Sequence, residues 1–187
     1  MHLKRLSNLG AAAAATLCVV AAATPVFAST ASEAVTGGTL SFVSAPGNVS
    51  FSGVTLDGLD HTATASLALD VSDPTGSNLG WNVSLSGTSW AGPTGGNLSD
   101  TSTTVTSATA GTCDTNSTCT PAQNSVSYTS LTVPLGSAPT PVEIYNAAAN
   151  SGEGNQSFTT SFALAVPAST TAGSYSSTWT VSLNSAP

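Results

Sequence analysis

Basic side chains are almost absent from this sequence. Of its 187 residues only Lys4 and Arg5 are basic, whereas nine are Asp or Glu and all nine lie after residue 28. Nucleic-acid binding needs cations that neutralise phosphate groups, and attraction to an anionic membrane surface needs them too. The composition therefore argues against both functions. It also excludes lysine-mediated crosslinks within residues 29–187.

Side chains that commonly catalyse reactions are also few. His61 is the only histidine after residue 28, and it follows Asp60 in a predicted turn. The chain has no Gly-x-Ser-x-Gly motif to supply an activated serine, so we expect His61 to be an exposed turn residue. Asp70 and Asp73 are candidates for the carboxylate pair of a secreted glycan hydrolase, but such residues more often stabilise turns. We therefore expect no enzyme, and the hydrolase is the less favoured alternative.

The N-terminal residues have the composition of a secretory signal peptide. The two basic residues precede an Ala-rich apolar run over 11–23, and Pro25 breaks this run. Val26 and Ala28 then supply small residues at the positions that signal peptidase reads. The run is too short for a stable membrane span. We expect cleavage after Ala28, export of the protein, and a flexible leader over residues 29–36.

Cysteine is rare, with three residues in the chain. If Cys18 is removed with the signal peptide, Cys113 and Cys119 remain. An even pair in an exported protein predicts a disulfide, and two free thiols are the alternative. No histidine lies nearby to complete a zinc site, and the spacing is too long for a thioredoxin-like redox motif.

The rest of the chain consists of short β-rich runs separated by Gly, Pro, Asn, Asp and Ser. No stretch after residue 28 has a helical period of useful length. This pattern predicts a single domain over 37–187 that folds as an all-β, antiparallel β-sandwich of about nine strands. Strands are expected near residues 39–44, 48–55, 62–71, 80–86, 101–108, 125–133, 142–145, 157–166 and 174–183.

Two of these expected strands share one pattern, in which a Trp lies two residues before a Val and four before a Leu. Side chains two apart on a strand point to the same face, so each segment carries one apolar stripe. The first stripe contains Trp81, Val83 and Leu85, and the second contains Trp179, Val181 and Leu183.

These two segments resemble the motifs of the WxL family of bacterial cell-surface domains. Val83 and Val181 replace the Leu for which that family is named, and the resemblance spans residues 37–187. It implies a protein at the cell surface that attaches non-covalently to the cell wall, with peptidoglycan as the target. Composition and periodicity alone indicate only a secreted β domain.

The motif tryptophans have two interpretations. A Trp in line with Val and Leu is normally part of a core, because burial of a large aromatic ring stabilises strongly. Alternatively, the rings of Trp81 and Trp179 line a shallow groove and stack on sugar rings. Trp90 lies outside both motifs in a turn-rich stretch, so it is the candidate for an exposed aromatic residue.

The acidic residues raise the question of a bound cation. Carboxylates are the hard oxygen ligands that calcium prefers, although no EF-hand loop is present. Calcium is the one cofactor considered, and its candidate ligands are Asp57, Asp60, Asp70 and Asp73.

Charge also limits how the protein can hold a cell wall. An anionic domain is repelled by anionic wall polymers, so binding must come from stacking and neutral hydrogen bonds or from a bridging divalent cation. The alternative function is a self-assembling surface subunit that pairs its strands with those of its neighbours in a fibre or coat.

Overall fold

The computed structural model describes residues 29–96 and 98–185. The predicted signal peptide, residues 1–28, lies outside the described residues. The chain divides into two units, Met1–Val35 and Thr36–Pro187. In the first unit, residues 29–35 of the predicted leader are exposed and have no regular secondary structure. The second unit contains the strands.

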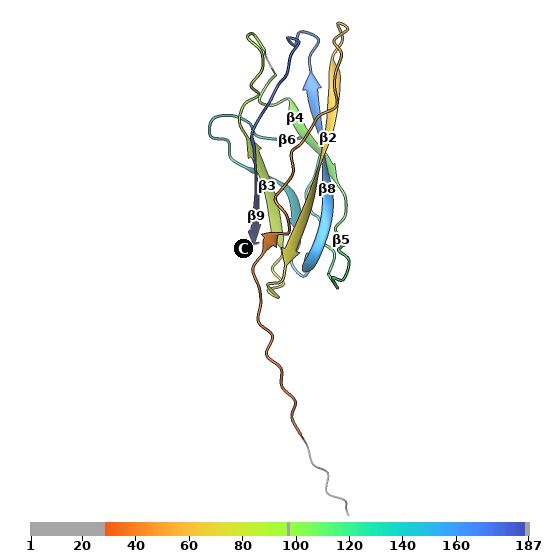
Figure 1. The fold of residues 1–187 in the computed structure, drawn as a ribbon, viewed down its shortest axis with the longest axis vertical. Coiled ribbons are helices and arrows are strands. Elements are labelled where there is room, and N and C mark those ends of the chain that lie inside the picture. Colours follow the sequence, from red (N-terminus) through yellow and green to blue (C-terminus); the bar gives the residue numbers. More distant parts are fainter. Residues whose placement is uncertain (1–28, 97, 186–187) are drawn as a thin grey trace, which may run out of the picture. The chain divides into compact units, whose positions relative to one another are not determined.

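The second unit is an all-β sandwich of two antiparallel sheets, and the described ranges contain no helix (Figure 1). This architecture confirms the predicted fold class. In chain order the strands are β1 (Ser41–Phe42), β2 (His61–Asp73), β3 (Trp81–Gly87), β4 (Thr103–Ala108), β5 (Thr112–Cys113), β6 (Leu131–Thr132), β7 (Val142–Ala147), β8 (Gly154–Val166) and β9 (Trp179–Ser185).

The first sheet is built around two long neighbouring strands. Its order is β1-β2-β8-β4-β6, and β5 also pairs with β8. β2 and β8 have 13 residues each and pair without interruption from His61↔Val166 to Asp73↔Gly154. Apolar and polar residues alternate along both strands, so one face of the sheet is buried and the other carries mostly Ser, Thr and Ala.

The second sheet contains both motif strands as direct neighbours. Its order is β7-β3-β9, and β3 pairs with β9 in antiparallel fashion. Val83 faces Leu183 across this ladder, and cross-strand apolar pairs of this kind stabilise a sheet. Trp81 pairs with Ser185 and Trp179 pairs with Gly87, so the two tryptophans lie at opposite ends of the ladder.

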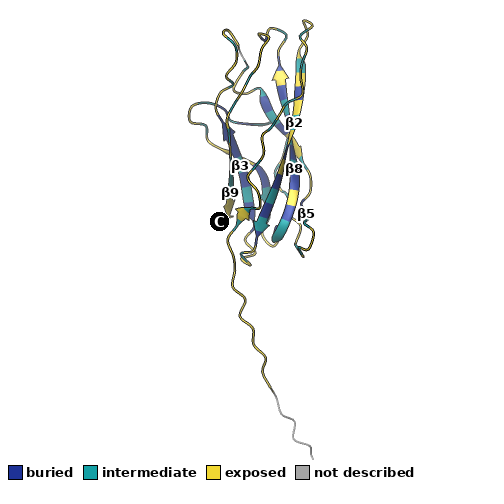
Figure 2. Cartoon of the chain, viewed as in Figure 1, coloured by how far each residue is buried: buried dark blue, intermediate teal, exposed yellow. Residues whose placement is uncertain are grey.

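The main core fills the space between the two sheets (Figure 2), and a second, smaller cluster contains Ala63, Leu164 and Val166. The largest fully buried side chains of the main core are Trp81, Tyr145 and Phe162. Burying one large apolar side chain stabilises a fold by about 1.5–3 kcal/mol, so a core of this size supports an independent domain. The predicted single domain over 37–187 agrees with this arrangement.

Some predicted strands are shorter or missing. The segment 48–55 is not a strand, because backbone bonding to β2 is limited to the Ser52 amide, which donates to the Thr64 carbonyl at 2.9 Å. The Thr64 amide donates to the Ser52 Oγ at 3.0 Å, so a hydroxyl takes the place of a ladder carbonyl. Residues 125–133 form only the two-residue β6, and β5 was not predicted.

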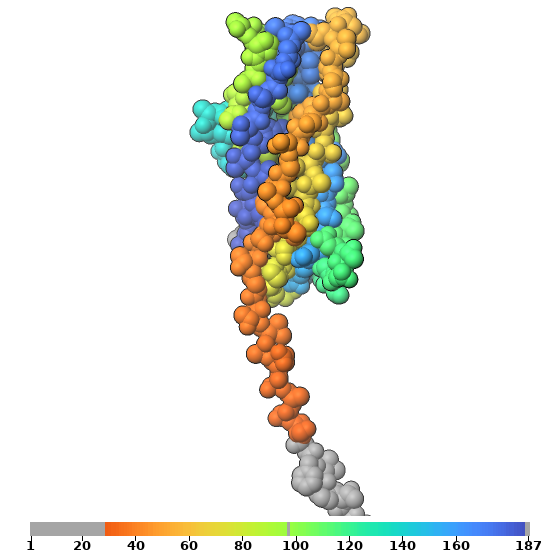
Figure 3. All heavy atoms as spheres, viewed as in Figure 1, coloured from red at the N-terminus to blue at the C-terminus, as the bar shows by residue number. Residues whose placement is uncertain are grey.

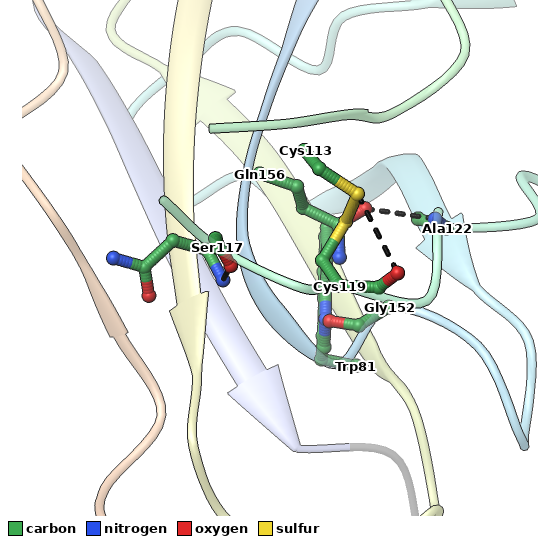
Figure 4. The surroundings of a disulfide bond; sticks show 8 residues. Trp81, Cys113, Ser117, Cys119, Ala122, Gly152 and Gln156 are labelled. Carbon is green, nitrogen blue, oxygen red and sulfur yellow. Dashed lines mark hydrogen bonds between the residues drawn. A yellow bond between two sulfur atoms is a disulfide. The ribbon is translucent and has the colours of Figure 1, made fainter. Parts of the chain in front are cut away.

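The predicted disulfide is present between Cys113 and Cys119, with a Cα–Cα distance of 5.5 Å (Figure 4). The loop that it closes is fastened to the start of β8, since the Asp114 amide donates to the Asn155 carbonyl at 3.0 Å. Beneath this loop, the buried Gln156 Oε1 accepts a hydrogen bond from the Ala122 amide at 2.7 Å. The disulfide thus holds a covering loop over one end of the core.

Replacing both cysteines by serine, Cys113→Ser with Cys119→Ser, is expected to lower stability. Opening so short a loop costs about 2–3 kcal/mol on the chain-entropy model, because the unfolded chain regains conformational freedom. Urea denaturation followed by tryptophan fluorescence measures this loss. A midpoint equal to that of the wild type would show that the loop is held by its hydrogen bonds alone.

Candidate functional site

A cleft of about 1410 Å³ lies between two extended chain segments, residues 46–56 and 170–181. We call it the edge groove. In Figure 3 the orange atoms of the first segment and the blue atoms of the second run side by side along one face. The groove is also lined by Ala63, Leu67, Trp90, Leu98, Leu164 and Val166.

The groove exists because neither sheet continues across this side of the sandwich. Segment 46–56 borders the first sheet at β2, and β9 is the last strand of the second sheet. The Ser176 carbonyl accepts a hydrogen bond from the Ala91 amide at 2.8 Å, and the Thr178 carbonyl accepts one from the Thr88 amide at 2.9 Å. Because adjacent residues alternate along a ladder, Ser177 and Trp179 direct their backbone groups away from β3. The second wall therefore offers free donors and acceptors, as an edge strand does.

Aromatic rings converge on the groove. The Phe51 ring meets the Trp90 ring edge-to-face at a centroid distance of 5.9 Å and the Trp179 ring at 6.1 Å. Trp179 also packs edge-to-face on the buried Phe162, at 5.0 Å. Edge-to-face contacts of this kind are favourable and hold rings in fixed orientations. Trp179 is consequently half-buried, anchored in the core and accessible from the groove.

Trp90 is half-buried rather than exposed, which corrects the expectation from the sequence. Its indole Nε1 donates to the Thr103 Oγ1 at 3.2 Å, and its ring packs on Phe51. The turn-rich sequence around Trp90 gave no sign of either contact, because both partners lie far away in the chain. Trp90 still lines the groove, as one of the residues that support the other rings.

Tyr175 closes one part of the groove wall. Its hydroxyl donates to the Thr171 carbonyl at 2.8 Å, and the Thr171 hydroxyl donates to the Gly95 carbonyl at 3.0 Å. The Tyr175 ring lies directly against Gly92, where any Cβ would collide with it. Glycine at this position lets the loop and the ring approach each other, which fixes Tyr175 in the wall.

None of the described residues that line the groove is charged. Its floor is apolar, and its walls are rich in hydroxyl groups. These hydroxyl residues are Ser50, Ser52, Thr55, Thr170, Thr171, Ser174, Ser176, Ser177, Thr178 and Thr180. Apolar floors with a few placed polar groups are typical of small-molecule and glycan sites. This combination suits a neutral ligand that has both apolar faces and hydroxyl edges.

The first motif tryptophan belongs to the core and not to the groove. Trp81 has 0% exposure and stacks on Tyr145 and Phe158 at centroid distances of 5.7 and 5.9 Å. Its Nε1 donates to the Gly152 carbonyl at 2.8 Å. Val83 is also fully buried, whereas Val181 is half-buried and lines the groove with Trp179. The two equivalent motifs thus occupy different environments.

The four predicted calcium ligands do not converge. Asp57 and Asp60 lie just before β2, whereas Asp70 and Asp73 lie at the far end of this 13-residue strand. The described residues contain no group of three or more potential metal-ligating side chains. These four carboxylates therefore do not form one calcium site, because the length of β2 separates the two pairs.

The first two of these carboxylates hold the chain in place before β2. Asp57 accepts hydrogen bonds from the Leu59 amide at 3.0 Å and from His61 at 2.8 Å, and the bond from His61 lowers the pKa of Asp57. Asp60 accepts from the Ala168 amide at 2.8 Å, across to the loop after β8.

Asp70 and Asp73 are not arranged as the carboxylate pair that the hydrolase alternative needs. Asp73 is buried and accepts hydrogen bonds from the Thr75 amide and hydroxyl at 3.1 and 2.6 Å. Asp70 lies three positions earlier, so it points to the opposite face of the strand. The two carboxylates do not face a common substrate position.

Asp70 has a partner that the sequence did not reveal. Its pKa is raised, first by burial and then by the nearby charge of Asp114. The two residues are 44 positions apart in the sequence, and β8 brings them together because it pairs with both β2 and β5. No local pattern in the sequence could have indicated this contact.

Comparisons of the chain with protein-family models, with curated proteins and with solved structures gave no match. The resemblance to the WxL family therefore stays a prediction based on the two motifs. Among residues 29–96 and 98–185, no helix has the length and apolar character needed to cross a membrane.

Asp70→Asn is expected to stabilise the protein at neutral pH. A carboxyl whose pKa is raised on folding favours the folded state at low pH, and this contribution is lost as the pH rises through the folded-state pKa. Asn mimics the protonated form, so the melting temperature should exceed that of the wild type at pH 7. The difference should vanish in acid, below the ordinary pKa of aspartate.

Glu33→Gln is the matched control, because Glu33 is exposed and lies in the leader. Its melting temperature should follow the wild-type curve at every pH. An Asp70→Asn protein that is less stable than the wild type at pH 7 would contradict the repulsion between Asp70 and Asp114.

Proposed function

We propose that this protein is a non-catalytic surface protein that binds a cell-wall glycan, with peptidoglycan as the target, through the edge groove. The observation that carries the proposal is the uncharged groove, in which Trp179 is anchored in the core and accessible from outside. Export to the cell surface enters the proposal from the signal-peptide pattern, and peptidoglycan enters it from the WxL resemblance.

Stacking on an aromatic ring is the main attraction in this proposal. A pyranose ring has an apolar face that packs on an indole, and its hydroxyl edges are satisfied by neutral hydrogen-bonding groups. The groove offers both, with Trp179 beside serine and threonine hydroxyls and the unpaired backbone of the second wall. A neutral groove also avoids repulsion between wall anions and the nine acidic residues elsewhere in the chain.

Two further observations support the absence of catalysis. Asp70 and Asp73 point to opposite faces of β2, so a glycosidase pair is missing at that place. His61 is bonded to Asp57 at 2.8 Å, and neither residue lines the groove. These features support a binding protein.

Self-assembly is the competing function, because the unpaired edge at β9 could accept a strand of another copy. Residues 29–187 contain nine carboxylates and no Lys or Arg, so copies repel one another. Ordered polymers that form from purified protein without wall material would favour self-assembly over glycan binding.

Trp179→Ala is expected to weaken binding to purified cell walls at least tenfold, because the stacking surface is lost. Sedimentation of the protein with wall fragments measures the bound fraction, and circular dichroism below the melting temperature checks that the variant is folded.

Trp81→Phe is the matched control at the other end of the ladder, about 20 Å away. It removes the hydrogen bond to Gly152, worth about 1 kcal/mol, and leaves a cavity in the core, so stability should fall by more than the bond alone, while the folded protein binds walls as the wild type does. Unchanged wall binding by folded Trp179→Ala would refute a role for the groove.

Wall binding is expected to be indifferent to sodium chloride or strengthened by it. Raising the salt from about 0.1 M to about 1 M shortens the Debye length from about 10 Å to about 3 Å, which screens the repulsion between protein and wall anions. The same sedimentation assay in both salts tests this. A steep loss of binding at high salt would show that ion pairs hold the complex, contrary to the proposal.

A further inference from the structure

We infer that the edge groove binds an internal stretch of a linear, neutral polysaccharide, with consecutive sugar rings lying along β9 and the segment before it. This inference rests on the proposed function and specifies the form of the ligand. It follows from the length of the groove, the spacing of its aromatic rings and the backbone of its walls.

The groove is much longer than a single sugar ring. Its two walls contain 11 and 12 consecutive residues, at 46–56 and 170–181. An extended chain rises about 3.3 Å per residue, so the wall formed by residues 46–56 is about 35 Å long. The second wall bends at residues 172–173 and is extended after them. A groove of this length fits a polymer chain lying lengthwise.

The aromatic rings of the second wall are too far apart to hold the same sugar. Tyr175 and Trp179 both line the groove and both are half-buried. They are four residues apart, so they project from the same face of the segment, about 13 Å from each other. A ligand that uses both must be at least an oligosaccharide, and its sugar rings must repeat along the wall.

The backbone of the second wall adds polar groups with a regular repeat. Ser177 and Trp179 direct their amide and carbonyl groups away from β3, because Ser176 and Thr178 use theirs to bond residues 91 and 88. Free groups on alternate residues recur about every 6.6 Å. They are uncharged, so they favour the hydroxyl or N-acetyl groups of a neutral chain over the carboxylates of stem peptides.

A strand from a second copy of this protein is the other extended chain that could lie here. The aromatic rings of Phe51, Trp90 and Trp179 occupy the floor and narrow the space for side chains on both faces of a strand. Like-charged copies also repel each other, as the composition requires. A neutral polysaccharide meets neither obstacle.

The test is the affinity of the full chain for glycan strands of graded length. The probe is a series of linear, neutral oligomers of β-1,4-linked N-acetylglucosamine, from the disaccharide to long strands, and intrinsic tryptophan fluorescence reports binding. The Kd should fall with each added disaccharide until the strand is as long as the groove, about 35 Å, and then stay constant.

Tyr175→Ala separates an extended site from a single subsite. It should weaken the binding of long strands about tenfold and leave the disaccharide unaffected, because the disaccharide occupies the position at Trp179. Trp179→Ala should weaken strands of every length, and Trp81→Phe none of them. If Tyr175→Ala does not fold, the length series on the wild-type protein decides alone.

Each other outcome has a definite meaning. A Kd that is the same from the disaccharide upward overturns the inference, because it indicates recognition of one unit or of a chain end. Strands that do not bind while intact walls are captured overturn the inference and leave wall binding in place. If neither binds, the proposed function itself fails. Trp179→Ala could also change the sedimentation of the protein without any ligand and leave strand binding unchanged. That result would overturn the inference and identify an interface between copies.

Discussion

The pairing of β3 with β9 is the contact on which the rest of the structure depends. It joins residues about one hundred positions apart and places Val83 opposite Leu183 and Leu85 opposite Val181. One end of this ladder inserts Trp81 into the core, where it stacks on Tyr145 and Phe158. The other end leaves Trp179 between the core and the edge groove.

The antiparallel direction of this ladder explains why two similar motifs have different roles. Equivalent residues of antiparallel strands lie at opposite ends of the pair, so the two tryptophans cannot share one environment. The end at Trp81 is covered by the loop that the Cys113–Cys119 disulfide holds in place. The end at Trp179 faces the gap between the two sheets, which only segment 46–56 borders on the other side.

Much of the fold could be predicted from the sequence, because it depends on local alternation. The stripes in β2, β3 and β8 are period-two patterns, and the structure buries those faces. Segment 48–55 has a similar composition but forms no strand. It lies beside β2 with few backbone bonds, and Gly53 interrupts it. Edge segments are decided by such tertiary details, which composition does not reveal.

The candidate site was less predictable than the fold. The sequence indicated Trp179, but it could not indicate that Phe51 and Trp90 would meet beside it, since these residues come from separate loops. The same reason applies to Asp70 and Asp114, which only the strand order brings together. The acidic residues that looked like calcium ligands are separated by the length of β2.

The scarcity of basic residues connects composition to function. Without basic side chains, a neutral surface is the part of the protein that an anionic polymer repels least, and the groove is such a surface. Hydrogen exchange of the backbone amides, with and without neutral oligomers of β-1,4-linked N-acetylglucosamine, tests this account most directly. It predicts slower exchange in residues 46–56 and 170–181 and no change on the outer face of β2 and β8. Slower exchange on that outer face, with none in the groove, would contradict it.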